Sequence, residues 1–235
     1  MLMVSDRIMA YHHQCPDMAY RAVLFDFDFT LGDSAEGIIH CANSALRSMG
    51  LEERDADAIR ASIGLSLKEK YVRITGDTDP VRGEEFERAF IEAADRDMTR
   101  MATFYPEALP LLAAVRGTGL KIGIVTTKYR RRITEVLDKY GVPDAVDVIV
   151  GGDSVKNPKP APDGLLLASE LLGIPVEEMV YVGDNEVDAK AARSAGMDFI
   201  GVLTGITTKD IMCQYPNVGI IGSIGSMYGL LGIRR

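Results

Sequence analysis

The chain has 235 residues, enough for one sizeable domain with a large insertion or for two small domains. Its 47% hydrophobic and 26% charged residues are typical of a globular protein, and its net charge of −8 argues against nucleic acid or an anionic membrane as a partner. No stretch approaches the roughly 18 apolar residues of a membrane span. Three scattered cysteines, Cys15, Cys41 and Cys213, lack metal-ligand spacing and fit a reducing compartment, so we expect a cytoplasmic protein.

The first part of the chain divides into three segments. Residues 1–17 lack the apolar core of a signal peptide, and we expect them to form a flexible extension. Residues 22–27 are an apolar run that predicts the first strand. Between residues 33 and 103 the apolar residues recur at helical spacing, which predicts an insertion of four helices without strands.

Strands and helices alternate in the rest of the chain. The pattern predicts strands at 120–126, 146–150, 179–183, 199–203 and 218–221. It predicts helices at 106–117, 129–140, 161–173, 186–195 and 207–213. Several strands are apolar at consecutive positions, as in a parallel sheet covered by helices on both faces. We therefore predict an α/β fold: a doubly wound, Rossmann-like parallel sheet formed by residues 18–32 and 104–235, with a helical domain, 33–103, inserted after the first strand.

Two carboxylates and a hydroxyl follow the first strand in the run Asp26-Phe27-Asp28-Phe29-Thr30. Strand alternation would place Asp26 and Asp28 on the same side of the backbone, a few ångströms apart. Like charges at that distance need a cation, a shared proton or both. The alternative is that these residues only cap the following turn.

Further polar side chains stand where other strands end or helices begin. Thr126 and Thr127 end one predicted strand, Lys159 lies in a proline-rich loop before a helix, and Asp184 ends another strand, with Asp188 one helical turn later. Ligands of open α/β sheets bind at the carboxyl ends of the strands. Carboxylates, a hydroxyl and a lysine at that edge are the parts of a Mg²⁺-assisted phosphoryl-transfer site.

These motifs resemble those of the haloacid dehalogenase-like hydrolase superfamily, over nearly all of the chain from residue 20 onward. The four motifs of that family correspond in order to Asp-x-Asp-x-Thr at 26–30, Thr126, Lys159 and Gly183-Asp184-x-x-x-Asp188. A helical cap after the first motif is similar to the phosphoglycolate phosphatase and β-phosphoglucomutase branch. Asp28 separates this chain from the family's dehalogenases, which lack the second aspartate, and from its phosphonate-cleaving members, which carry alanine there.

The resemblance implies a role for each acidic residue. Asp26 would be the nucleophile that forms an aspartyl-phosphate, and Asp28 the general acid and base. Mg²⁺ would be held by Asp26, the backbone carbonyl of Asp28 and Asp184, with Asp188 as a further ligand or a group that orients one. For Asp188 the alternatives are a helix cap or an ion pair with Lys159.

The resemblance also assigns the remaining polar groups. Thr126 would bind a phosphate oxygen, although it could merely satisfy a strand-end backbone group. Lys159 would neutralise charge on the transferring phosphoryl group and restrain Asp26. Its alternative is a solvated charge, and Lys156 competes for the same role.

Substrate contacts are expected from two regions. Near the strand ends the candidates are Thr30, Thr127 and Lys128; Lys128 would meet a second phosphate or, alternatively, be an exposed charge. In the predicted cap, Gly64 and Ser66 lie in a turn between helices that resembles the family's substrate-facing loop. Phe29 occupies a position that is most often glycine in this family.

The predicted function is a Mg²⁺-dependent phosphatase of a small phosphorylated metabolite, similar to phosphoglycolate phosphatase. An inorganic pyrophosphatase and a phosphoryl transferase of the β-phosphoglucomutase type remain alternatives, and a non-catalytic binding protein on the same fold is a more distant one. No nucleic-acid or membrane partner is expected, and the sequence does not indicate an oligomeric state.

Overall fold

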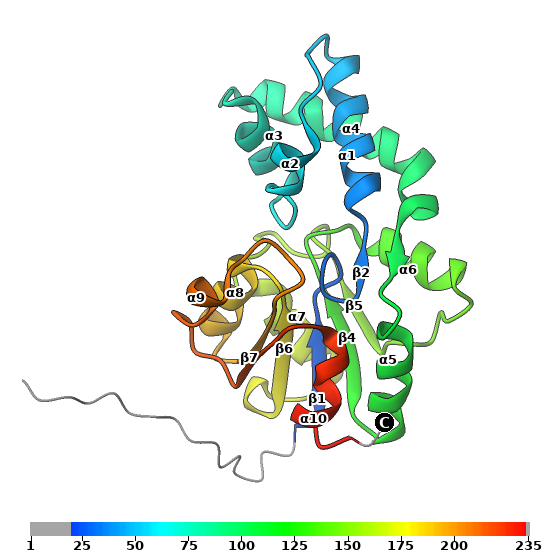
Figure 1. Cartoon of the computed structure of the whole chain (residues 1–235), viewed down its shortest axis with the longest axis vertical. Helices are drawn as coiled ribbons and strands as arrows, with labels where there is room; N and C mark the ends of the chain where they lie inside the picture. Colours follow the sequence, from blue (N-terminus) through cyan, green and yellow to red (C-terminus); the bar gives the residue numbers. More distant parts are fainter. Residues whose placement is uncertain (1–19, 234–235) are drawn as a thin grey trace, which may run out of the picture.

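The computed structural model describes residues 20–233, so the predicted extension at 1–17 lies outside the described residues. An α/β layer structure lies below a group of helices in Figure 1. The sheet has six strands in the order β5-β4-β1-β6-β7-β8, and each neighbouring pair is parallel. The strands are β1 (Ala22–Phe25), β4 (Lys121–Val125), β5 (Val148–Val150), β6 (Met179–Gly183), β7 (Asp198–Val202) and β8 (Gly219–Ile221). The predicted doubly wound sheet is confirmed.

Alternate residues of the strands enter two separate hydrophobic cores. Val23 and Phe25 of β1 belong to the core beneath α5 (Ala108–Gly117), α6 (Arg130–Lys139), η2 (Ile224–Ser226) and α10 (Met227–Leu230). Ala22 and Leu24 belong to the core beneath α7 (Asp163–Leu172), α8 (Glu186–Ala195) and α9 (Lys209–Met212), and η1 (Val176–Glu178) precedes β6. Both faces are therefore buried, which explains why these strands are apolar at consecutive positions.

The four predicted helices of the insertion are α1 (Ala35–Ser48), α2 (Ala56–Arg60), α3 (Leu67–Thr75) and α4 (Pro80–Met101). The short polar residues before them provide caps: Asp55 begins α2, Ser66 and Glu69 form a capping box on α3, and Asp79 precedes Pro80 in α4. The apolar stripes of these helices meet in a third core that includes Phe86. The helices form a cap over the carboxyl ends of the strands (Figure 1).

A two-stranded antiparallel ribbon joins the cap to the sheet. It consists of β2 (Gly32–Asp33) and β3 (Thr103–Phe104), in which Gly32 pairs with Phe104 and Asp33 with Thr103. The prediction of no strand between 33 and 103 was wrong at these two ends. Strands of two residues are too short to produce a period-2 pattern, and only the approach of the two chain segments creates them. In the part of the chain that the structure describes, no helix is both long and apolar enough to cross a membrane.

Candidate active site

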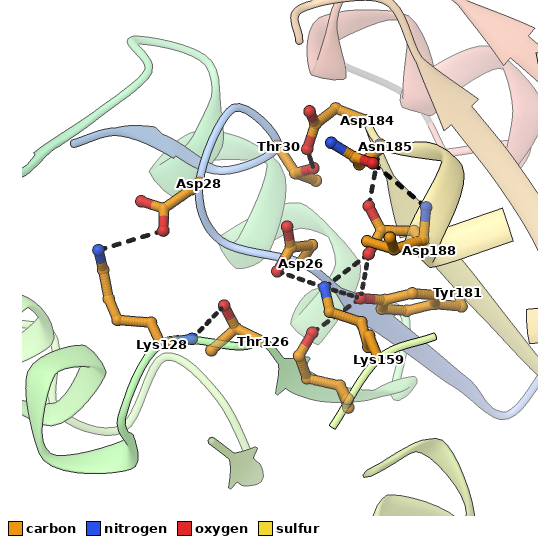
Figure 2. A network of polar contacts seen from close by, with 12 residues as sticks. Asp26, Asp28, Thr30, Thr126, Lys128, Lys159, Tyr181, Asp184, Asn185 and Asp188 are labelled. Carbon is orange, nitrogen blue, oxygen red and sulfur yellow. Dashed lines mark hydrogen bonds and ion pairs between the residues drawn. The ribbon is translucent and has the colours of Figure 1, made fainter. Parts of the chain in front are cut away.

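The strand order brings three of the predicted motifs together. β1 lies between β4 and β6, so Asp26, Thr126 and Asp184, which follow these strands, meet at one edge of the sheet. Asp26 and Asp184 are buried, with 4% and 2% of their surfaces exposed. Figure 2 shows Asp26 in the middle of the group, with Asp184 and Asp188 on one side and Asp28 on the other. This edge lies beneath the cap.

Lys159 is buried at the centre of the site. Its Nζ lies 2.9 Å from Asp26 Oδ1 and 2.5 Å from Asp188 Oδ1, whereas the alternative lysine, Lys156, is exposed. Burial by itself lowers the pKa of Lys159, but Asp188 and Asp26 outweigh it and keep that pKa above its ordinary value. Burial raises the pKa of Asp26 to about 6, against the opposing charge of Lys159. The lysine therefore stabilises an ionised carboxylate that water does not reach.

Three buried carboxylates form a candidate metal site. Oxygens of Asp26, Asp184 and Asp188 all lie within 4.8 Å of one another. Burial, and then the charges of Asp188 and Asp26, raise the pKa of Asp184 well above its usual value. A single lysine does not balance three carboxylates, and an all-oxygen donor set suits a hard divalent cation. The backbone also leaves room around the cluster, because a Cβ on Gly205 would come within 1.8 Å of Asp184 Oδ2.

Asp188 and Asp184 are held by their neighbours. Asp188 Oδ2 accepts a hydrogen bond of 2.9 Å from the Asn185 backbone N–H, as part of the capping box that begins α8. Thr30 donates to Asp184 Oδ1 at 3.2 Å. Both alternatives for Asp188, a helix cap and an ion pair with Lys159, occur together with its place in the acidic cluster. Thr30 thus contacts an acidic residue of the cluster.

The Asp28 carboxylate does not belong to this acidic cluster. Its Oδ2 lies 3.1 Å from Lys128 Nζ, and its Oδ1 is buried without a hydrogen-bond partner among the described residues. The regular strand ends at Phe25, so Asp26 and Asp28 turn toward different lysines (Figure 2). Only 8% of the Lys128 side chain is exposed, so the alternative of an exposed charge is wrong. Asp28 therefore has a buried carboxylate oxygen that is free to bind another group.

A cavity of about 200 Å³ lies between the cap and the sheet, beside Asp28. Thr127 and Lys128 line it from the sheet, and Gly64 and Ser66 from the cap. Gly64 has a φ of 94°, and a Cβ there would lie 3.1 Å from Asn185 Nδ2, so the loop uses glycine to approach the sheet domain closely. The Ser66 hydroxyl donates to Glu69 in the capping box.

Two other predicted positions have clear local roles. The Thr126 Oγ1 accepts a hydrogen bond of 3.3 Å from the Lys128 backbone N–H, and 4% of the residue is exposed. Phe29 has a φ of 59°, the left-handed region that glycine adopts easily. Its side chain is buried in the core of the cap. The departure from glycine therefore provides a hydrophobic contact between the first motif and the cap.

Sequence reasoning missed two buried residues of this region. The Tyr181 hydroxyl accepts from Lys159 Nζ at 2.9 Å and lies 2.8 Å from the Val125 carbonyl oxygen, yet in sequence it is one apolar residue among others in β6. Lys70 is 3% exposed and lines the cavity from α3. A signal existed for it: Leu67, Lys70 and Ile74 follow the helical period, so a lysine occupies the apolar stripe.

This fold and site define a class of enzyme, and comparisons with known proteins agree. The model of the haloacid dehalogenase-like hydrolases matches residues 23–202, and the chain belongs to this family. It is 32% identical over 216 residues to a phosphoglycolate phosphatase of Neisseria meningitidis, covering 88% of this chain and 92% of that protein. It is 33% identical over 235 residues to a phosphoglycolate phosphatase of Escherichia coli O157:H7, covering 91% of this chain and 93% of the relative.

Solved structures agree with the fold. A crystal structure of a haloacid dehalogenase-like hydrolase from Bacteroides fragilis has a TM-score of 0.85 and 40% identity, covering 88% of this chain and 99% of that one. The protein is a phosphatase of this family, in the phosphoglycolate phosphatase-like subfamily with a helical cap. Enzymes of this kind act on small phosphorylated substrates.

Proposed function

We propose that the protein hydrolyses a small phosphate monoester of the phosphoglycolate type, with Asp26 as nucleophile and Asp28 as general acid and base. One observation carries the proposal: a buried carboxylate at the end of β1 is bound to a buried lysine, and a second carboxylate with a free oxygen lines a cavity nearby. The first group is suited to attack phosphorus, and the second to exchange a proton with the leaving oxygen.

The reaction has two steps. A carboxylate oxygen of Asp26 attacks phosphorus, the bond to the ester oxygen breaks, and that oxygen takes a proton from Asp28. Asp28 then takes a proton from water, the water oxygen attacks phosphorus, and the bond to Asp26 breaks to release inorganic phosphate. Lys159 keeps Asp26 ionised and, with Thr126, offsets charge on the phosphoryl oxygens. Charge stabilisation is the largest contribution that such a site makes.

We further propose that Mg²⁺ is the cofactor. Asp26, Asp184 and Asp188 would hold it, and the Asp28 carbonyl would complete the set. When bound, the cation supplies positive charge that offsets the repulsion between carboxylate and phosphate. The all-oxygen donor set and the excess of negative charge support this assignment. Thr30 supports it indirectly, since its hydroxyl orients Asp184.

The sheet domain and the cap have different roles in this proposal. We propose that residues 18–32 and 104–235 carry the chemistry, and that the cap, residues 33–103, closes the cavity and selects the leaving group. The Gly64–Ser66 turn and Lys128 are the nearest groups for that selection, because they line the cavity beside Asp28. The two lysines of the cavity, Lys70 and Lys128, also keep pyrophosphate as a candidate substrate.

Phosphate release tests the proposal. Purified protein is assayed with phosphoglycolate, hexose phosphates, nucleotides and pyrophosphate, each with Mg²⁺ and with a chelator. We expect Mg²⁺-dependent release, fastest with a small substrate, and loss of at least about 10³-fold in kcat for Asp26→Asn. The matched control is Asp138→Asn, which changes an exposed aspartate on α6 and should retain full activity.

Two results would contradict the proposal. Absence of phosphate release from every substrate would exclude a general phosphatase, and conversion between glucose phosphates would then indicate a phosphoryl transferase. Wild-type rates in Asp26→Asn would exclude Asp26 as the nucleophile. Loss of activity in both the Asp26 and the Asp138 variants would point to damaged folding, which a thermal melt detects.

A further inference from the structure

The cavity beside Asp28 has an uneven distribution of charge. Its cap wall carries the apolar residues Ile38, Phe90 and Met98 together with the charged residues Lys70 and Glu87. The sheet domain lines it with Lys128, Arg131 and Arg132. At about 200 Å³ it lies below the range of roughly 300–1,000 Å³ that is typical of pockets for drug-sized ligands. The space therefore suits a small leaving group, with cations within reach.

Three of these four cations already have carboxylate partners. Lys128 is paired with Asp28 at 3.1 Å. Arg131 and Arg132 both form ion pairs with Asp95, and Arg132 forms another, at 2.7 Å, with Glu135. None of these three cations has an unbalanced charge to offer a ligand.

Lys70 is different. Its Nζ donates to the Ser62 carbonyl oxygen at 2.7 Å and to the Ser62 hydroxyl at 3.1 Å, and no carboxylate of the described residues forms an ion pair with it. An ammonium group has three N–H donors, so one is left for another acceptor. The residue is 3% exposed, which means that water does not solvate the charge freely.

A buried ammonium without a counter-ion is costly, and proteins rarely retain one on a helix stripe without a use for it. Burial lowers the pKa of Lys70 to about 7, with Asp28 raising it and Lys128 lowering it further. An anion in the cavity would provide the missing partner. Since Asp28 lies on the same cavity, that anion would be part of the leaving group on which Asp28 acts.

We infer that Lys70 is a specificity-determining residue that binds a compact anionic group, a carboxylate or a second phosphate, on the leaving group of the substrate. The inference rests on the proposed function, because it uses Asp28 to locate the leaving group. It narrows the substrate class to small phosphate esters or anhydrides whose leaving group carries its own negative charge. Phosphorylated hydroxy acids and pyrophosphate meet this condition, and esters of neutral alcohols do not.

A paired-substrate experiment tests it. 2-Phosphoglycolate is compared with 2-hydroxyethyl phosphate, in which a hydroxymethyl group replaces the carboxylate, and pyrophosphate supplies the second-phosphate case. Initial rates are measured for wild type, Lys70→Met and Lys70→Arg. The matched control is Lys68→Met, which removes a lysine of the same helix whose side chain is 54% exposed and paired with Glu84 at 3.1 Å and Glu87 at 3.9 Å.

The expected result is selective. Lys70→Met should raise KM about 10- to 100-fold for an anionic leaving group while kcat changes little, as expected for loss of a charged hydrogen bond. Its rates with 2-hydroxyethyl phosphate should stay near those of wild type. Lys70→Arg should restore much of the lost affinity, and Lys68→Met should behave as wild type. A Lys70 effect on phosphoglycolate alone identifies a carboxylate site, and one on pyrophosphate alone identifies a phosphate site.

Other outcomes overturn the inference. Equal loss with charged and neutral leaving groups would make Lys70 a structural residue, and Lys70→Gln, which keeps a polar contact to Ser62, would then recover activity with both kinds of substrate. Wild-type protein that hydrolyses 2-hydroxyethyl phosphate as well as it hydrolyses the anionic substrates would refute the inference while the proposed phosphatase stands. Absence of hydrolysis of every substrate would instead remove the proposed function, and the inference with it.

Discussion

Replacement of Lys70 by methionine should stabilise the protein in the absence of substrate. Burial lowers the pKa of Lys70 from 10.5 to about 7. At about 1.36 kcal/mol per pKa unit, this shift corresponds to a penalty on the order of 4 kcal/mol at pH 7. A methionine of similar length would leave the cavity wall filled without this cost.

The loss of hydrogen bonds offsets part of the gain. Lys70 makes two bonds to Ser62, each with a net value of about 1 kcal/mol. Both Ser62 oxygens keep other partners, since the carbonyl accepts from the Leu65 backbone N–H and the hydroxyl donates to the Ile59 carbonyl. We therefore expect Lys70→Met to be more stable than wild type by about 2 kcal/mol at pH 7.

The difference should depend on pH. The unfolded chain keeps the Lys70 proton up to about pH 10, whereas the folded protein releases it near pH 7. The unfolded state therefore binds more protons in this window, so the Lys70 contribution to wild-type stability rises with pH. Asp28 and Lys128 are the charged groups that act on Lys70, and both remain in the variant. The advantage of Lys70→Met should shrink between pH 7 and pH 10.

Urea denaturation at several pH values measures this difference, with Lys68→Met as the control for an exposed charge on α3. The reasoning is refuted if Lys70→Met is less stable than wild type at pH 7. It is also refuted if the free-energy difference between the two proteins does not change with pH. The first result would mean that Lys70 contributes to folding, and the second that burial does not lower its pKa in the folded protein.

Three further predictions concern the acidic cluster. Gly205→Ala should lower Mg²⁺ affinity, measured as the rise in melting temperature with Mg²⁺, because its Cβ would displace Asp184; Gly222→Ala, with open space around it, should not. Tyr181→Phe should cost about 1–3 kcal/mol in urea denaturation and lower kcat, because Lys159 loses a buried partner. In the absence of metal, the free energy of unfolding of Asp26→Asn should exceed that of wild type by up to about 2 kcal/mol at pH 7, and by less at pH 4. Burial raises the pKa of Asp26 to about 6, so ionisation above the pKa of the unfolded chain destabilises the folded wild type. The first expectation is contradicted if Gly205→Ala responds to Mg²⁺ as wild type does. The second is contradicted by wild-type stability and kcat in Tyr181→Phe, and the third by a stability difference between Asp26→Asn and wild type that does not change with pH.

The sequence predicts those parts of the site that depend on the order of strands. Asp26, Thr126 and Asp184 each follow a short apolar run, and parallel strands place such residues at a common edge. Lys159 could be chosen over Lys156 by its motif, and burial distinguishes the two in the structure. Local patterns suffice here because the sheet itself brings these residues together.

The remaining features arise from contacts between segments far apart in the chain. In sequence, Lys128 resembles a surface charge, but in the structure it is buried and paired with Asp28. Lys70 lines the cavity only because α3 packs over the sheet domain. Tyr181 looks like any apolar residue of β6, and its hydroxyl gains a function from Lys159. The ribbon of β2 and β3 is too short for any periodicity. Such features depend on tertiary packing, which a pattern along one segment does not encode.

The proposed reaction depends on transfer of the phosphoryl group to Asp26. The most direct measurement is rapid acid quench of the enzyme during turnover, followed by digestion and mass spectrometry of the peptide that contains Asp26. We expect this peptide to gain one phosphoryl group that hydroxylamine removes, and the Asp26→Asn peptide to gain none. Phosphate release by the wild type with no phosphorylated Asp26 at any quench time, and with full activity in Asp26→Asn, would contradict this expectation.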